Sequence, residues 1–317
     1  MLLGGALGDA IGSAIEFTPW SEIALRYGPK GLQEPAFRPM NFTDDTQMTL
    51  FAAEAVKRHR ETGCELLPEL RMSIRYWHAT QNIELNQYPP DWYRHPLIAN
   101  AAMLHLRSPG HTCLQYGDWA DGTLEYSINS SKGNGGAMRI APLAFGIENR
   151  WEAFKTGCKF AAMTDGHPDG YVSAGALTSI LHGILRGQSI RQSVDTTLEM
   201  LDQVNARDSD TYRKLAMAVT WAETEPRQRE RIEDLGRGFT GEEAVSIAVY
   251  SALSFPDDFK DAVRLAINHG GDSDTCGLMA GQIMGAHLGS ASLPSSWISS
   301  LEPSELEIIN QYNKENP

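Results

Sequence analysis

Two stretches near opposite ends of the chain carry glycine at every fourth position: Gly4, Gly8 and Gly12 in the first, and Gly277, Gly281 and Gly285 in the second. In an α-helix these positions form one face without side chains, so another backbone can come close. Glycine costs roughly 1 kcal/mol per helical position relative to alanine, so close packing must offset the loss. We therefore predict two helices deep in the core, the first over residues 2–16, which help to bring distant segments together.

Apolar residues recur at helical spacing along most of the remaining chain, and no stretch alternates as a strand does. The expected helices cover residues 45–60, 65–79, 96–107, 172–185, 192–204, 209–224, 241–254 and 258–268. Residues 223–234 form a charged break that favours a solvated loop, and Ser304 with Glu307 gives a capping-box pattern for a last short helix. No repeat or linker marks a boundary. The sequence predicts an all-α fold in a single compact domain over residues 1–317.

The charge balance disfavours two classes of partner. Lys and Arg number 27 against 40 Asp and Glu, so the formal net charge is −13. Nucleic-acid backbones and anionic membranes are polyanions, so we expect neither as a partner. The four cysteines are widely spaced, which fits a reducing compartment. The first residues lack signal-peptide features and no apolar run reaches transmembrane length, so we expect a cytoplasmic protein.

The stretch just before the second glycine-faced helix has the pattern of a metal corner. Asp272 and Asp274 lie two apart with Thr275 beside them, and Gly270-Gly271 lets the backbone turn sharply at the helix start. Three hard oxygen donors suit a hard divalent cation, and a buried pair of carboxylates is costly unless something positive lies between them. The alternative is that Asp274 or Thr275 is an ordinary helix N-cap, because Asp and Thr are preferred caps.

A second Thr/Asp cluster opens the helix expected at 45–60. Thr43, Asp44, Asp45 and Thr46 stand before apolar positions at helical spacing. The two clusters mirror each other. Together their Asp and Thr oxygens can surround two cations about 3.5–4 Å apart, which is the separation that two-metal hydrolytic sites use.

A glycine-rich loop over residues 127–139 precedes another helical segment. Gly133, Gly135 and Gly136 flank Asn134 just before Ala137. Backbone amides freed of side chains at a helix start bind anions, although the same glycines can simply make a tight turn.

Five stretches in order carry a resemblance to a known family: Gly5–Gly12 leading to Glu16, Thr43–Thr46, Ser131–Arg139, Thr164–Pro168 and Gly270–Thr275. This ordered set resembles the ADP-ribosylglycohydrolases, which include the dinitrogenase-reductase activating glycohydrolase and the ADP-ribosylhydrolases. The resemblance implies a metal-dependent hydrolase that removes ADP-ribose from protein side chains by cleaving the N-glycosidic bond, and arginine is the expected acceptor. ADP-ribosylated protein is then the expected substrate partner.

The resemblance also implies roles for particular residues. Glu16 and Asp45 are the expected catalytic residues, Glu16 by handling the attacking water, whereas Asp9 is expected to be structural. Two divalent cations, Mg or Mn, are expected on six positions: Thr43, Asp44, Asp45, Asp272, Asp274 and Thr275. The ligand is expected to contact a set from the glycine-rich loop and beyond: Ser131, Lys132, Gly133, Asn134, Gly135, Gly136, Met138 and His167.

Two positions depart from the family pattern. Lys132 stands where some relatives place an aromatic residue that helps to stack the adenine, and it adds a positive charge near the expected diphosphate. Asp165 stands where many relatives have a histidine that contacts the ligand. His167 either substitutes for that histidine or serves only as a helix-entry residue, in which case the contact is lost.

Two other functions remain open at the level of sequence. The family includes toxin-neutralising members, so an immunity protein that binds an ADP-ribosyltransferase toxin is the alternative, and acidic surfaces often cap basic partners. A catalytically silent relative of the lens-crystallin kind is the third reading. Retention of Glu16 and all six metal-type positions argues against it.

Overall fold

The computed structural model describes residues 1–81 and 88–315, and within them the fold is all-α. The longer helices are α1 (Leu2–Gly12), α2 (Trp20–Tyr27), α3 (Asp44–Thr62), α4 (Leu66–Gln81), α8 (Arg150–Ala162), α9 (Pro168–Leu185), α10 (Ile190–Gln203), α11 (Asp210–Thr224), α13 (Gly241–Ser254), α14 (Phe259–Ile267), α15 (Ser273–Leu288) and α17 (Pro303–Glu315). The shorter ones are α5 (His111–Tyr116), α6 (Gly135–Met138), α7 (Ala141–Gly146), α12 (Arg229–Leu235) and α16 (Ser295–Ile298). The only strand-like pairings in these residues are two isolated bridges, Met40 with Leu301 and Gly133 with Thr240.

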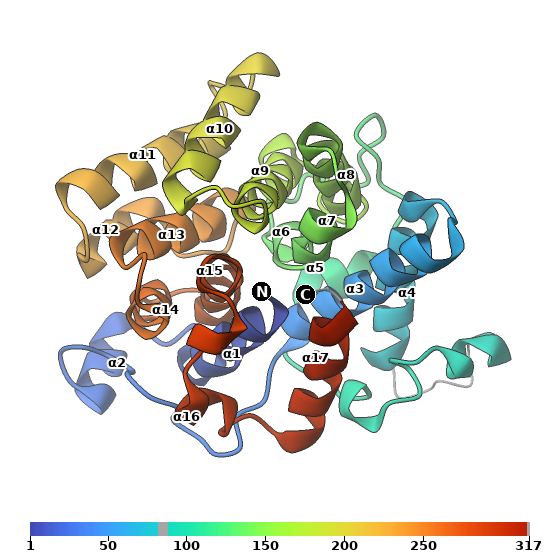
Figure 1. The fold of residues 1–317 in the computed structure, drawn as a ribbon, viewed down its shortest axis with the longest axis horizontal. Helices are drawn as coiled ribbons and strands as arrows, with labels where there is room; N and C mark the ends of the chain where they lie inside the picture. The colour runs from blue at the N-terminus through green and yellow to red at the C-terminus, as the bar shows by residue number, and fades with distance from the viewer. Residues whose placement is uncertain (82–87, 316–317) are drawn as a thin grey trace.

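Helices α1 and α15 lie side by side at the centre of the molecule (Figure 1). Their glycine faces meet: a Cβ built on Gly8 would lie 1.9 Å from the Gly277 carbonyl oxygen, and one on Gly281 would lie 2.1 Å from that of Gly4. The backbones touch, so each stripe has the close backbone neighbour that its glycines predict, and that neighbour is the other stripe. Every residue of α1 is buried, so this pair forms the centre of the core.

The other helices surround this pair in groups (Figure 1). Helices α3 and α4 pack together on one side, α8 packs on α9, α11 packs on α13, and α13 and α14 both pack on α15. One hydrophobic cluster runs from Leu2 to Tyr312 through all of these groups. The described residues thus share one core, as the sequence predicts. No helix among them is long and apolar enough to cross a membrane.

The prediction of a helix over residues 96–107 is wrong. Only a short 3-10 turn, η4 (Ala101–Met103), forms there. Carbonyl groups of this segment bond to α3 instead. The Gln47 amide donates to the carbonyl oxygen of Met103, which a helix would use, and to that of His105, at 3.3 and 3.0 Å, and the Asp44 N–H donates to the Arg107 carbonyl at 2.9 Å. Apolar spacing alone did not reveal this competition.

Two smaller predictions also need correction. Residues 223–234 are not a loop throughout, because α12 occupies Arg229–Leu235, where Ile232 and Leu235 are fully buried between charged neighbours. The last helix forms, but Glu302 caps it in place of the predicted Ser304 box. The Glu302 carboxylate accepts from the N–H groups of Ser304 and Glu305 at 2.9 and 3.1 Å.

Candidate active site

The two acidic clusters meet because two separate contacts fix α3 and α15 against α1. Asp9 on α1 accepts hydrogen bonds from the N–H groups of Thr43 and Thr46 at 3.0 and 3.1 Å, which fixes the start of α3 against α1. Asp9 is thus structural, as predicted. The glycine contact fixes α1 against α15, whose first turn carries Asp274. The starts of α3 and α15 therefore face each other, although more than two hundred residues separate them.

Each cluster also caps its own helix. The Thr43 hydroxyl accepts from the Asp45 N–H at 3.3 Å, and Asp272 accepts from the Thr275 N–H at 3.3 Å. The caps are Thr43 and Asp272, whereas the capping alternative named Asp274 or Thr275 for the second helix. The caps use the Thr43 hydroxyl and one oxygen of Asp272. They do not use the other carboxylate oxygens of the two clusters, so capping and ion binding are compatible in this site.

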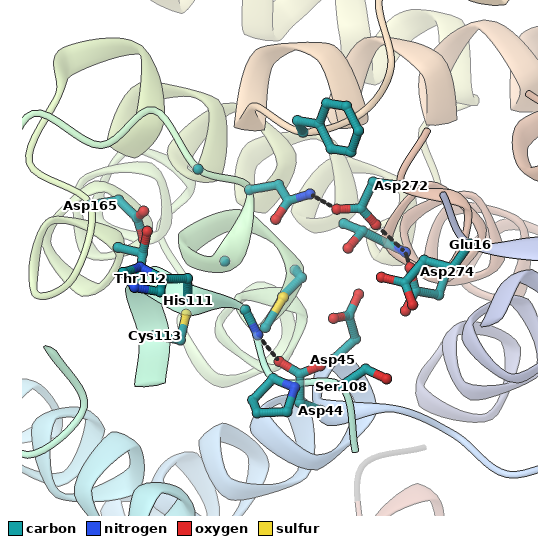
Figure 2. Close-up of a pocket in the computed structure, with 18 of the residues that line it drawn as sticks. Glu16, Asp44, Asp45, Ser108, His111, Thr112, Cys113, Asp165, Asp272 and Asp274 are labelled. Carbon is teal, nitrogen blue, oxygen red and sulfur yellow. Dashed lines mark hydrogen bonds between the residues drawn. The ribbon is translucent and has the colours of Figure 1, made fainter. Parts of the chain in front are cut away.

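A cavity of about 300 Å³ lies between the clusters and is lined by Asp44, Asp45, Asp272, Asp274 and Thr275, together with Glu16. Oxygen atoms of Glu16, Asp272 and Asp274 lie within 4.8 Å of one another. Figure 2 shows Asp44 and Asp45 in the same cavity, below these three. Thr43 does not line the cavity, since its hydroxyl is turned to the helix start.

The electrostatics of this cluster fit a cation. Burial, and then neighbouring carboxylates, raise the pKa of Asp45 and Asp274 well above the usual range. Oδ2 of Asp45 is buried without a hydrogen-bond partner, and no lysine or arginine is among the described residues that line the cavity. Two helix N-termini favour negative charge, but each supplies only about half a positive charge. Clustered carboxylate and hydroxyl oxygens are the donor set that hard divalent cations take.

Glu16 lies just beyond η1 (Ser13–Ile15), at the end of the first helical segment. Burial, and then the charges of Asp272 and Asp9, raise its pKa to about 7. The carboxylate is half-buried at the cavity wall and close to Asp272 and Asp274. It is therefore placed to act on a molecule held between the clusters.

The glycine-rich loop forms another wall, but its members divide. Gly133, Asn134, Gly135 and Met138 line the cavity. The Asn134 amide donates to Oδ2 of Asp272 and to the Gly238 carbonyl oxygen, both at 2.7 Å. Gly136 instead packs on α8, where a Cβ would lie 2.6 Å from the Cβ of Ala161.

Lys132 and His167 are not among the residues that line the cavity. The Lys132 ammonium lies 2.6 Å from Asp210 and 3.3 Å from Asp169, and the hydrogen bond to Asp210 is the main reason that its pKa is raised. Nδ1 of His167 accepts from the Asp169 N–H at 3.1 Å and caps α9. In this structure Lys132 joins the glycine-rich loop to α9 and α11, and His167 is a helix-entry residue.

Asp165 occupies the far end of the cavity, beside His111, Thr112 and Cys113 (Figure 2). Its carboxylate is fully buried and accepts from the hydroxyls of Ser131 and Thr164 at 2.8 and 2.7 Å. Burial raises its pKa. Ser131 does not line the cavity but donates a hydrogen bond to Asp165, which does.

Several lining residues are absent from the sequence-based set: Phe17, Ser108, Pro109, Gly110, His111, Thr112, Cys113 and Phe239. The Ser108-Pro109-Gly110 turn follows the segment wrongly expected to be helical, and the Gly110 N–H donates to Asp44 at 3.2 Å. The turn signal was present, but nothing local links it to a cluster 66 residues away. Phe17 directly follows Glu16, and Phe239 follows Gly238, whose carbonyl accepts from Asn134. Nothing in the sequence except the nearness of Phe17 to Glu16 indicated that these residues line the cavity.

Comparisons with known proteins give a consistent result. A family model described as ADP-ribosylglycohydrolase matches residues 1–315. The chain is 25% identical to the ADP-ribosylarginine hydrolase Tri1 of Serratia proteamaculans (strain 568), over 96% of this chain and 75% of that protein. It is 23% identical to the ADP-ribosyl-[dinitrogen reductase] glycohydrolase of Rhodospirillum rubrum, over 95% and 88%. It is 25% identical to ADP-ribosylhydrolase ARH3 of Gallus gallus, over 95% and 88%.

A solved structure described as an ADP-ribosylglycohydrolase-related protein complex has the same fold. It matches with a TM-score of 0.64 at 22% identity and covers 100% of this chain and 96% of its own.

Proposed function

The chain belongs to the ADP-ribosylglycohydrolase family, and from this premise we propose that it hydrolyses the N-glycosidic bond between ADP-ribose and an arginine side chain of a modified protein. The observation that carries the proposal is the meeting of the two acidic clusters beside Glu16, in a cavity that the glycine-rich loop also lines. The relative named as an ADP-ribosylarginine hydrolase supports arginine as the acceptor.

Asp44, Asp45, Asp272, Asp274 and Thr275 are the proposed ligands of two divalent cations, Mg or Mn. The orphaned Asp45 oxygen and the raised pKa values of buried carboxylates support this assignment. Thr43, the sixth position expected from the sequence, caps α3 and does not line the cavity, so we leave it out of the proposed ligand set. When bound, such cations supply Lewis-acid stabilisation of negative charge on ribose and water oxygens.

Glu16 is the proposed acceptor of a proton from the attacking water. Its oxygens lie close to those of Asp272 and Asp274 but outside the helix caps, so the carboxylate is free to face a bound water. The water oxygen forms a bond to the anomeric carbon as the carbon–nitrogen bond breaks. The guanidine leaves with the electron pair of that bond, and the proton that Glu16 took from the water passes to the released guanidine. Asp45 has one carboxylate oxygen without a hydrogen-bond partner. We propose that this oxygen positions a cation against the ribose of the substrate.

The glycine-rich loop is proposed to bind the ADP-ribose diphosphate. Gly133 and Gly135 line the cavity with their backbone, because they have no side chains, and Asn134 and Met138 line it beside them. Gly136 supports this wall from behind. Ser131, Lys132 and His167 contribute by holding the loop and its neighbours, through Asp165, Asp210 and Asp169 respectively.

The test is a panel of acceptor linkages. Proteins carrying ADP-ribose on arginine, on serine or on acidic side chains are incubated with the protein and with Mg or Mn, and released ADP-ribose is measured. We expect release from the arginine linkage to be fastest. Faster release from another linkage would change the proposed acceptor, and no release from any of them would remove the proposed activity.

A second proposal is an immunity protein that binds an ADP-ribosyltransferase toxin. The formal net charge of −13 favours it, since an acidic surface complements a basic partner. A Glu16→Gln protein that binds a transferase and suppresses its activity would support this role independently of hydrolysis. Absence of binding by both wild type and Glu16→Gln would reject it.

A further inference from the structure

Two phenylalanine rings flank the cavity on the side of Glu16. Phe17 and Phe239 both line it, and their ring centroids lie 5.8 Å apart at an interplanar angle of 41°. Both remain exposed, at 58% and 44%. Large aromatic rings are usually buried, so two neighbouring exposed rings at a cavity mouth mark a surface built for contact.

Both rings are fixed by the same backbone that carries the acidic corner. Phe17 has a φ of 56°, in the left-handed region that phenylalanine rarely adopts, and its N–H donates to the Gly271 carbonyl at 2.9 Å. On the other side, the Asp272 N–H donates to the Arg237 carbonyl at 2.8 Å, two residues before Phe239. The strained backbone and the two bonds hold the aromatic pair in register with Asp272.

The surroundings of the pair select a cation. Glu16, Asp272 and Asp274 lie in the same part of the cavity, and no described lysine or arginine lines it. Aromatic faces attract cations, and a planar guanidinium stacks on them particularly well. Two divalent cations balance the four Asp carboxylates of the proposed metal site, so Glu16 is the negative charge left beside the rings. A carboxylate next to aromatic faces suits the arginine side chain better than it suits an anion.

We propose that Phe17 and Phe239 form the acceptor subsite, which binds the guanidinium of the modified arginine. This inference rests on the proposed function, because it names the side chain that the same site releases. Phe17 directly follows Glu16, so the pair lies next to the bond on which Glu16 acts. The adenine is the competing aromatic ligand, but a ribose and two phosphates separate it from that bond.

The test compares turnover with binding of the common product. For Phe239→Ala and Phe17→Gly, kcat/KM on an ADP-ribosylarginine peptide is measured beside the Kd of free ADP-ribose. Glycine is chosen at position 17 because it adopts a positive φ without strain. We expect kcat/KM to fall by about threefold to thirtyfold, as loss of a cation–π contact implies, while the Kd of ADP-ribose stays within about twofold. Phe239→Trp, which keeps an aromatic face at this position, should retain turnover.

Phe37→Ala is the matched control, since Phe37 is 66% exposed and lies outside the cavity lining. An equal loss of ADP-ribose affinity in the Phe239 and Phe17 variants would make the pair an adenine platform and overturn the inference. Unchanged kcat/KM would overturn it as well. A wild type that does not cleave the arginine-linked peptide would sink the proposed function itself, which is a different outcome from active wild type with equally active variants.

Discussion

The side-chain amide of Asn134 donates a hydrogen bond to the Asp272 carboxylate. Sequence reasoning placed it among the ligand-binding residues, yet its Nδ2 donates to Asp272 and to the Gly238 carbonyl, both at 2.7 Å. A hydrogen bond of this kind orients a carboxylate for a metal. The side chain therefore connects the glycine-rich loop to the proposed ligand set.

Asn134→Ala should weaken binding of Mn or Mg by roughly 10- to 100-fold, the usual cost of removing a residue that orients a metal ligand. Calorimetric titration with each ion measures it. Met138→Leu, on the same loop, is the control and should keep the wild-type affinity. If Asn134→Ala binds metal normally but loses ADP-ribose affinity, the amide serves the ligand instead, as the sequence predicted.

Glu16 and Asp274 should respond differently to loss of charge. Glu16→Gln keeps the shape but cannot accept a proton, so turnover should fall on the order of 10²–10⁴-fold with metal and ADP-ribose binding retained. Asp274→Asn should lose metal as well as rate, because a neutral ligand removes charge that balances the cation. ADP-ribose release and metal content are measured on both. Full activity of Glu16→Gln would eliminate its role as a base.

The sequence predicted which segments form the site more reliably than it predicted which side chains of those segments point into the cavity. Asp44, Asp45, Asp272 and Asp274 were predicted to converge, and they line one cavity. Lys132 and His167 belong to the right segments, but their side chains pair with Asp210 and the Asp169 N–H. Chain order does not say which way a side chain points when three carboxylates on other helices compete for a lysine.

At the scale of elements, the contact between α1 and α15 should be the least tolerant of added volume. A Cβ on Gly8 would lie 1.9 Å from the Gly277 carbonyl oxygen, so one backbone must move. Gly8→Ala should lower the free energy of unfolding by about 1–3 kcal/mol or more, as overpacking does, and should weaken metal binding because the clusters separate. Denaturant unfolding and metal titration measure both effects.

Gly63→Ala is the comparison variant, since nothing lies within 4 Å of its added Cβ and only its φ of 72° opposes the change. It should lose about 1 kcal/mol from the strained backbone alone, with metal affinity unchanged. A Gly8→Ala protein as stable as wild type would contradict the close packing of the two helices.

Helices with a strong apolar period or a glycine stripe were predictable, whereas those decided by tertiary hydrogen bonds were not. The glycine stripes predicted that α1 and α15 lie deep in the core with another backbone close to each, but not that the two helices pack on each other. The segment 96–107 has helical spacing, but Gln47 and the Asp44 N–H bind its carbonyls. In α12, two buried residues stabilise a short helix within a charged stretch. Such outcomes depend on neighbours distant in sequence.

Over the whole molecule, protons and cations should compete for the same buried carboxylates. Burial raises the pKa of Asp9 to about 6 and that of Glu16 to about 7, and it raises those of Asp44, Asp45 and Asp274. A carboxyl group whose pKa is higher in the folded state than in the unfolded state stabilises the fold while it is protonated. This stabilisation is complete below the unfolded pKa, near 4, and is lost as the pH rises through the folded pKa, about 7 for Glu16. Without metal, the carboxylates should destabilise the protein over this window.

The gain in Tm on adding Mn or Mg should therefore be larger at about pH 7.5 than at about pH 5.5. The gain is the useful readout because buried His95 and His269, with pKa values lowered to about 4, change the stability of the metal-free protein in the opposite direction. Differential scanning at both pH values measures it. An equal gain at the two pH values, or one retained in Asp274→Asn, would place the ions elsewhere.

The central claim is that the two acidic clusters form one metal centre on which hydrolysis depends. The most direct measurement is ADP-ribose release from an arginine-modified protein, with bound metal counted per chain, first on metal-stripped protein and then after Mg or Mn is returned. We predict no turnover when stripped, recovery with two ions per chain, and loss of both in Asp45→Asn. Full turnover by the stripped chain, or an active Asp45→Asn protein without metal, would contradict the claim.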